Sequence, residues 1–194
     1  MKIIVAILFL LTGTASWADK RPNILFFLVD DMGIGDTSVP FLYRDGEAQK
    51  IKLNDLYRTP NMAKLAESGR IFTNAYSYSV CSPTRISLMT GQAAPRHRVT
   101  TWTHPKQSSI DTGLVKTGKI RSPANWRVTG LDRSLPLLPR LMQQAGYRTL
   151  FAGKAHFGPD DTSSGDPTNL GFDVNIAGFG GGGPGSYWGK YNYS

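Results

Sequence analysis

The sequence NILFFLV at Asn23–Val29 is a continuous apolar run that ends in two carboxylates, Asp30 and Asp31. Runs without polar alternation are typical of strands that are covered on both faces, as in a parallel sheet. The residues Met32–Asp36 would form the loop at the carboxyl end of this strand, which is where open α/β sheets place their sites. The run therefore predicts a buried parallel strand with a functional loop at its end.

Helix and strand signals alternate along the rest of the chain. The first expected helix begins at Pro60, with Thr59 as its cap and Gly69 as its stop, and a strand follows over 70–78. A second helix runs from Pro83 to Thr90, and Gly91 ends it. Ser134 caps a third helix that Gly146 stops, with Leu137, Leu138, Leu141 and Met142 on its inner face, and a strand follows over 147–152. This order indicates an α/β fold with a mostly parallel central sheet flanked by helices. The polar, basic stretch between Pro95 and Arg133 predicts a long loop, either functional or disordered.

The N-terminus has the organisation of a secretory signal peptide. Lys2 precedes an apolar stretch from Ile3 to Leu11, and small residues lead to a cleavage point after Ala18. The stretch is shorter than the about 20 residues that a membrane-spanning helix needs; an uncleaved N-terminal anchor is the alternative. We expect a signal peptide at residues 1–18, a mature chain at 19–194, and a periplasmic or secreted protein without a stable membrane anchor.

The formal charge of the chain is +8, and Lys2 contributes one of these charges to the expected signal peptide. The basic residues are dispersed, and no aromatic-basic module or helix-turn-helix pattern accompanies them, so we expect no nucleic-acid partner. Two interpretations remain, a general attraction for anionic substrates and a merely solvated basic surface. The chain stops soon after the glycine-rich residues 178–185 without a closing element, so we expect it to be the N-terminal part of a longer catalytic domain.

Cys81 is the only cysteine and so cannot be half of an internal disulfide. A lone cysteine is often a small buried hydrophobic residue, but this one begins the sequence CSPTR, and L-M-T-G follows at 88–91. Pro83 predicts that Cys81 lies at the start of a helix, where backbone N–H groups favour an anion. Arg85 would lie within one turn of it and offer a rigid set of donors, although in isolation such an arginine indicates only a surface ion pair.

The carboxylates at the end of the apolar run have two interpretations. Asp30 and Asp31 are either an exposed turn or oxygen ligands of a hard cation such as Ca²⁺ or Mg²⁺. On the dipeptide alone the exposed turn is the better interpretation; the sequence M-G-x-G-D follows at 32–36. Asp36 is expected to hold the loop rather than to bind metal.

Lys154 and His156 lie in the sequence GKAHFG at 153–158, after the last expected strand. In an extended segment, side chains two positions apart lie on the same face. One of these groups could then bind an anion while the other holds a nucleophile or the substrate. The other two histidines, His97 and His104, are expected to be structural.

These motifs together resemble those of type I sulfatases, a branch of the alkaline-phosphatase-like superfamily, and the resemblance covers about residues 22–158. C-x-P-x-R with a downstream T-G resembles the family's nucleophile signature, and DDMGIGD resembles its first metal motif. GKAHFG is similar to the family's G-K-W-H-L-G, with Ala155 and Phe157 at the two differing positions. The resemblance implies that a maturation enzyme oxidises Cys81 to formylglycine, whose hydrate attacks the sulfur of a sulfate ester.

The resemblance also implies roles for six residues, either in binding a cation or in handling the sulfate. Asp30, Asp31 and the formylglycine from Cys81 would bind the divalent ion, usually Ca²⁺ in this family, with Mg²⁺ possible; Arg85 would stabilise the nucleophile, Lys154 would contact the sulfate, and His156 would assist the nucleophile. Further ligands and catalytic residues of the family come from sequence later than residue 194, so we expect the 194 residues alone to bind metal weakly and to be inactive.

The expected function is hydrolysis of an organic sulfate ester. An exported location and loops that carry tryptophan and tyrosine favour a sulfated carbohydrate as the substrate. One alternative is a phosphonate or phosphodiester hydrolase, since some members of the superfamily share the C-x-P-x-R nucleophile. Another is a non-catalytic protein that binds anions or glycans, which becomes the better interpretation if the chain ends at Ser194.

Overall fold

The computed structural model describes residues 21–104, 106, 118, 129–184, 186 and 188. The chain divides into two units, Met1–Asp30 and Asp31–Ser194, and each is described by itself. The expected signal peptide at 1–18 lies outside the described residues. Among the helices of the described residues, none combines the length and the apolar character that crossing a membrane requires.

In the first unit, residues 21–29 have neither helical nor strand structure. Their apolar side chains are exposed, with Leu25 at 80% and Phe27 at 79%. The buried strand predicted at Asn23–Val29 is therefore wrong for this structure. A strand needs neighbouring backbone to accept and donate its hydrogen bonds, and none of the described residues pairs with this segment.

The second unit begins with a small hairpin that the sequence analysis did not predict. Strands β1 (Leu42–Arg44) and β2 (Glu47–Gln49) pair antiparallel, with Leu42 opposite Gln49. Asp45 and Gly46 connect them with φ values of 52° and 85°, as the tight turns of two-residue hairpin loops require.

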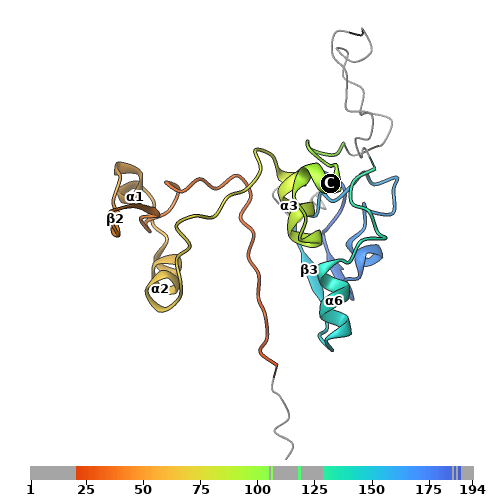
Figure 1. Ribbon diagram of the computed structural model, residues 1–194, viewed down its shortest axis with the longest axis horizontal. Coiled ribbons are helices and arrows are strands. Elements are labelled where there is room, and N and C mark those ends of the chain that lie inside the picture. The colour runs from red at the N-terminus through yellow and green to blue at the C-terminus, as the bar shows by residue number, and fades with distance from the viewer. Residues whose placement is uncertain are drawn as a thin grey trace, which may run out of the picture. The chain divides into compact units, whose positions relative to one another are not determined.

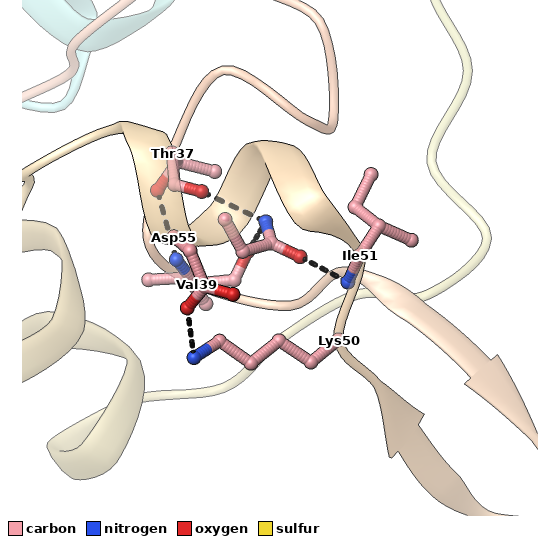
Figure 2. Close-up of polar contacts among 6 residues, drawn as sticks. Thr37, Val39, Lys50, Ile51 and Asp55 are labelled. Carbon is pink, nitrogen blue, oxygen red and sulfur yellow. Dashed lines mark hydrogen bonds and ion pairs between the residues drawn. The ribbon is translucent and has the colours of Figure 1, made fainter.

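Helix α1 (Lys52–Leu56) follows the hairpin, and one buried side chain ties it to the preceding loop. The amide nitrogen of Asn54 donates to the carbonyl oxygens of Thr37 at 2.8 Å and Val39 at 3.3 Å, and its amide oxygen accepts from the backbone N–H of Ile51 at 2.9 Å (Figure 2). Lys50 and Asp55 form an exposed ion pair beside this network.

Helix α2 (Pro60–Ser68) has the predicted limits, with Thr59 as its N-cap residue and Gly69 at its end. The hydroxyl group of Thr59 does not cap the helix. It accepts from the backbone N–H of Ser38 at 2.9 Å and pairs with the hydroxyl group of Thr37 at 2.8 Å. The strand predicted over 70–78 does not form, since these residues have no strand partner among those described.

The remaining elements form a packed group. They are α3 (Cys81–Thr90), α4 (Ala94–His97), α6 (Leu138–Gln144), β3 (Leu150–Ala152), the 3-10 helix η2 (Pro167–Leu170) and β4 (Val174–Ile176). Strands β3 and β4 pair in parallel, with Leu150 opposite Val174. Helix α3 contacts α4 and α6 (Figure 1). A parallel pair beside helices agrees with the predicted α/β class.

The core lies among α3, α6 and the segments that flank β3. Its buried residues are Ile86, Met89, Val99, Leu131, Leu137, Ala155, Phe157 and Leu170. The ring of Phe151 in β3 packs edge-on against two other rings, those of Phe157 at 5.6 Å and Phe172 at 5.2 Å. The core therefore includes Ala155 and Phe157, the two apolar residues of the 153–158 motif, and holds that motif in place.

Two predictions about α6 are wrong. Leu137, not Ser134, is its N-cap residue, because Ser134 bonds instead to the carboxylate of Asp132 through its backbone N–H and its hydroxyl group. Of the four residues expected on the inner face, only Leu137 is fully buried, whereas Leu138 and Leu141 are 40% and 49% exposed. The expected inner face is therefore partly open to solvent.

Candidate active site

Helix α3 begins at Cys81, two residues before the predicted start at Pro83. Val80 is the extended N-cap residue, and the hydroxyl group of Thr84 accepts from the backbone N–H of Tyr78 at 3.0 Å, which fixes the entry of the chain into the helix. Gly91 ends the helix in a left-handed conformation, as predicted. Cys81 is thus half-buried in the first turn, where α3 leaves backbone N–H groups without helical partners.

His156 lies against Cys81 although 75 positions separate the two residues. The distance between Cys81 Sγ and His156 Nδ1 is 3.1 Å. His156 Nε2 lies 2.7 Å from the carbonyl oxygen of Thr103. Because a carbonyl oxygen can only accept, Nε2 carries a proton, and in a neutral ring Nδ1 then accepts from the Cys81 thiol.

The backbone of His156 is held in an unusual conformation. Its φ of 52° lies in the left-handed region, which is unfavourable for residues other than glycine. Its N–H donates to the carbonyl oxygen of Phe179 at 3.1 Å. A Cβ atom on Gly182 would lie 3.0 Å from His156 Cε1, so the glycine-rich segment passes closely over the ring. His156 is only 3% exposed as a result.

Arg85 contacts the 153–158 motif from the next part of α3. Its Nη1 donates to the backbone carbonyl oxygen of Lys154 at 2.5 Å, and its side chain is 5% exposed. The contact fixes the position of Lys154, which is half-buried. The segment is not uniformly extended, because the φ angles of Gly153 and His156 are 94° and 52°; that Lys154 and His156 share one face stays a prediction.

The two carboxylates fall on either side of the boundary between the units. Asp30 ends the first unit, whereas Asp31 and Cys81 both belong to the second. Among the described residues, no group of three or more His, Cys, Asp and Glu side chains could hold a metal. Because Ca²⁺ takes six to eight oxygen ligands, an ion bound by Asp30 and Asp31 would need ligands beyond these side chains.

Asp36 has the predicted structural role. Its carboxylate accepts from the backbone N–H of Gly33 at 2.8 Å and closes the loop that follows the two carboxylates. Asp31 in the same loop has a φ of 53°. Asp45, Arg98, His156 and Ala177 have left-handed φ angles as well, so this conformation does not by itself mark a functional residue.

His97 is a structural residue, as predicted. It is 3% exposed, its Nδ1 accepts from the backbone N–H of Val99 at 3.2 Å, and its Nε2 lies 2.9 Å from the hydroxyl group of Ser87. Burial lowers the pKa of His97 below its ordinary value, against smaller opposing contributions from backbone hydrogen bonds. His97 therefore joins α4 to α3 as a neutral ring.

Thr103 is the residue that the sequence analysis missed. It lies within the polar stretch that was expected to be a loop, and nothing in its local sequence distinguishes it from neighbouring threonines. Its importance comes only from the contact between its backbone carbonyl oxygen and His156.

The family model for sulfatases, described as "Sulfatase", matches residues 22–193. The chain belongs to the sulfatase family. Human N-acetylgalactosamine-6-sulfatase is 35% identical to this chain over 146 residues, which cover 74% of this chain and 23% of the relative. Human steryl-sulfatase is 32% identical, over 81% of this chain and 23% of the relative.

The sulfatase chain also resembles a solved structure, the crystal structure of Ps i-CgsB, with a TM-score of 0.51 and 26% sequence identity. The similarity covers 84% of this chain and 30% of the other. The predicted alkaline-phosphatase-like α/β fold is thereby confirmed, in the part that this chain supplies. The chain spans about a quarter of the length of the curated relatives it matches.

Proposed function

We propose that the whole protein hydrolyses sulfate esters and that Cys81 is the precursor of its nucleophile. The observation that carries this proposal is the 3.1 Å contact between Cys81 Sγ and His156 Nδ1. It joins the C-x-P-x-R and GKAHFG motifs, which are far apart in the sequence. The sulfatase relatives support the reaction class.

Oxidation of Cys81 to formylglycine by a maturation enzyme would supply a hydrated aldehyde, which is a nucleophile that can be regenerated. His156 acts on this residue rather than on a distant part of the substrate, because its ring is buried and its Nδ1 points at position 81. A neutral ring with the proton on Nε2 can accept a proton from residue 81 through Nδ1.

The positively charged residues of the site have separate functions in this proposal. Arg85 holds the carbonyl oxygen of Lys154 and, as a buried cation near residue 81, stabilises negative charge there. Lys154 contacts the sulfate group. Both functions depend on the hydrogen bond between Arg85 and the 153–158 segment, which sets the distance between α3 and Lys154.

We propose that Asp30 and Asp31 contribute oxygen ligands to a divalent cation, Ca²⁺ or alternatively Mg²⁺. The chemistry of two adjacent carboxylates supports this assignment. Together with residue 81 they are too few for Ca²⁺, so the ion would need further ligands. The cation would supply positive charge next to the sulfuryl oxygens.

The substrate we propose is a sulfated carbohydrate, and the location is the periplasm or the exterior of the cell after removal of residues 1–18. Four of the relatives are named N-acetylgalactosamine-6-sulfatase, which is the name of an enzyme for a sulfated sugar. Of the aromatic residues in the loops, Trp102 and Trp188 are exposed, at 50% and 72%, while Trp126 and Tyr187 lie outside the described residues.

The test has two parts. Peptide mass spectrometry of residues 71–85, from protein made in its native host, should show a mass about 18 Da below that of the cysteine peptide, as expected when sulfur and two hydrogens are replaced by oxygen. The whole protein should then hydrolyse an aryl sulfate faster than a phosphodiester of the same alcohol, and Cys81→Ala should abolish both activities. An unmodified thiol without activity would refute the proposal and favour an anion-binding protein, whereas a preference for the phosphodiester would favour the other hydrolase.

A further inference from the structure

We infer that Ser82 and Thr103 are positioning residues, which hold His156 in the tautomer that presents an unprotonated Nδ1 to residue 81. The inference rests on the proposed function for its effect on catalysis, but its structural part does not. The hydrogen bonds form a closed path. Cys81 contacts His156, His156 bonds to Thr103, Thr103 bonds to Ser82, and Ser82 follows Cys81 in α3.

The carbonyl oxygen of Thr103 determines which ring nitrogen carries the proton. It lies 2.7 Å from His156 Nε2 and can only accept a hydrogen bond. The other tautomer would direct a lone pair at this oxygen in a region where His156 and Thr103 are 3% and 4% exposed. Water cannot replace the lost hydrogen bond easily there, so that tautomer is disfavoured.

Ser82 fixes where the carbonyl group of Thr103 lies. Its hydroxyl oxygen accepts from the backbone N–H of Thr103 at 3.1 Å, and the two hydroxyl groups lie 3.4 Å apart. Ser82 is fully buried in the first turn of α3. The carbonyl group that accepts from His156 is therefore held by the same turn of α3 that carries Cys81. One helix thus positions the groups at both nitrogens of the imidazole ring.

The opposite side of the ring is closed as well. The backbone N–H of His156 is bonded to Phe179, and Gly182 approaches Cε1. These contacts limit rotation of the ring. The carbonyl oxygen of Thr103 accepts from a ring nitrogen, which is why we assign the choice of tautomer to this residue and to its anchor, Ser82.

The substitution that tests this inference is Ser82→Ala, with Ser82→Thr as the conservative variant. Ser87→Ala is the matched control, because it removes a hydroxyl group from the same helix that contacts the other buried histidine, His97. In the 194-residue chain, the ¹⁵N shifts of the His156 ring should show the proton on Nε2. Ser82→Ala should yield a mixture of His156 tautomers, whereas Ser82→Thr and Ser87→Ala should leave the proton on Nε2.

In the whole protein, Ser82→Ala should lower kcat by about 10-fold or more with little change in KM, by analogy with the loss seen when the hydrogen-bond partner of a metal-bound histidine is removed. Rates are divided by the fraction of matured residue 81, measured by mass spectrometry, so that poor maturation is not mistaken for poor positioning. The acid limb of the pH profile should move in Ser82→Ala and stay in Ser87→Ala.

The two proposals fail in different ways. If the ring responds to Ser82→Ala as expected but the whole protein does not cleave sulfate esters, the positioning inference stands and the proposed function falls. If wild-type His156 carries its proton on Nδ1, or if Ser82→Ala leaves the tautomer and the normalised kcat unchanged, the positioning inference is overturned, whatever the activity.

Discussion

Asn54→Ala should destabilise the region around α1 far more than an ordinary helix substitution. The side chain is 4% exposed and makes hydrogen bonds to three backbone groups, those of Thr37, Val39 and Ile51. The 3.3 Å bond to Val39 is weak, so only the bonds to Thr37 and Ile51 are counted in the free energy of unfolding. Leaving a buried backbone group without its partner costs about 1–3 kcal/mol, and the two together predict a loss of about 2–6 kcal/mol.

The assay is urea unfolding of the 194-residue chain, combined with hydrogen exchange of the Ile51 amide. Asn61→Ala is the matched control, because Asn61 is an exposed residue of α2. Asn54→Asp keeps the acceptor for Ile51 but loses both donors, so it should retain part of the Ile51 protection while still lowering stability. A loss below about 0.5 kcal/mol in Asn54→Ala, or unchanged exchange at Ile51, would refute the view that this amide holds the loop after the two carboxylates.

Three further predictions concern pH and packing. Because burial keeps the folded-state pKa of His97 below its ordinary value, the free energy of unfolding should fall as the pH drops below about 6.5, and His97→Gln should flatten that slope in urea titrations. Hydrogen bonds from the backbone N–H and the hydroxyl group of Thr149 lower the pKa of Asp173. The stability that they contribute at neutral pH should be lost below about pH 4, and Asp173→Asn should remove this loss. Gly158→Ala should cost about 1–3 kcal/mol, since its Cβ would overlap with Ser164 Oγ. Gly183→Ala, with open space around it, should leave the melting temperature unchanged, and equal effects would contradict the packing argument.

The helices were predictable where local residues determine them. Pro60 and Gly69 mark the ends of α2, and Gly91 ends α3, because a proline in the first turn and a left-handed glycine after the last act within one turn of the chain. The strands at 23–29 and 70–78 were predicted from composition in the same way, yet neither forms here. A strand depends on pairing with distant backbone, and that information is not contained in the run itself.

The site was predictable in its residue types but not in its contacts. Cys81 and His156 could each be singled out from a motif, and the contact between them follows only from the folded chain. The left-handed conformation of His156 has no sequence signal, since glycine is the usual residue there. Thr103 acts through its backbone, so the identity of its side chain carries no information about that role.

The left-handed backbone of His156 has a consequence for attempts to stabilise this protein in the laboratory. A residue with a Cβ atom in that conformation costs roughly 1 kcal/mol relative to glycine, so the backbone at position 156 by itself would favour a glycine. A selection for heat resistance alone would then accept variants that relieve this strain and discard the imidazole ring. Thermostable variants of this protein should therefore be selected under simultaneous pressure for turnover, with position 156 withheld from the library.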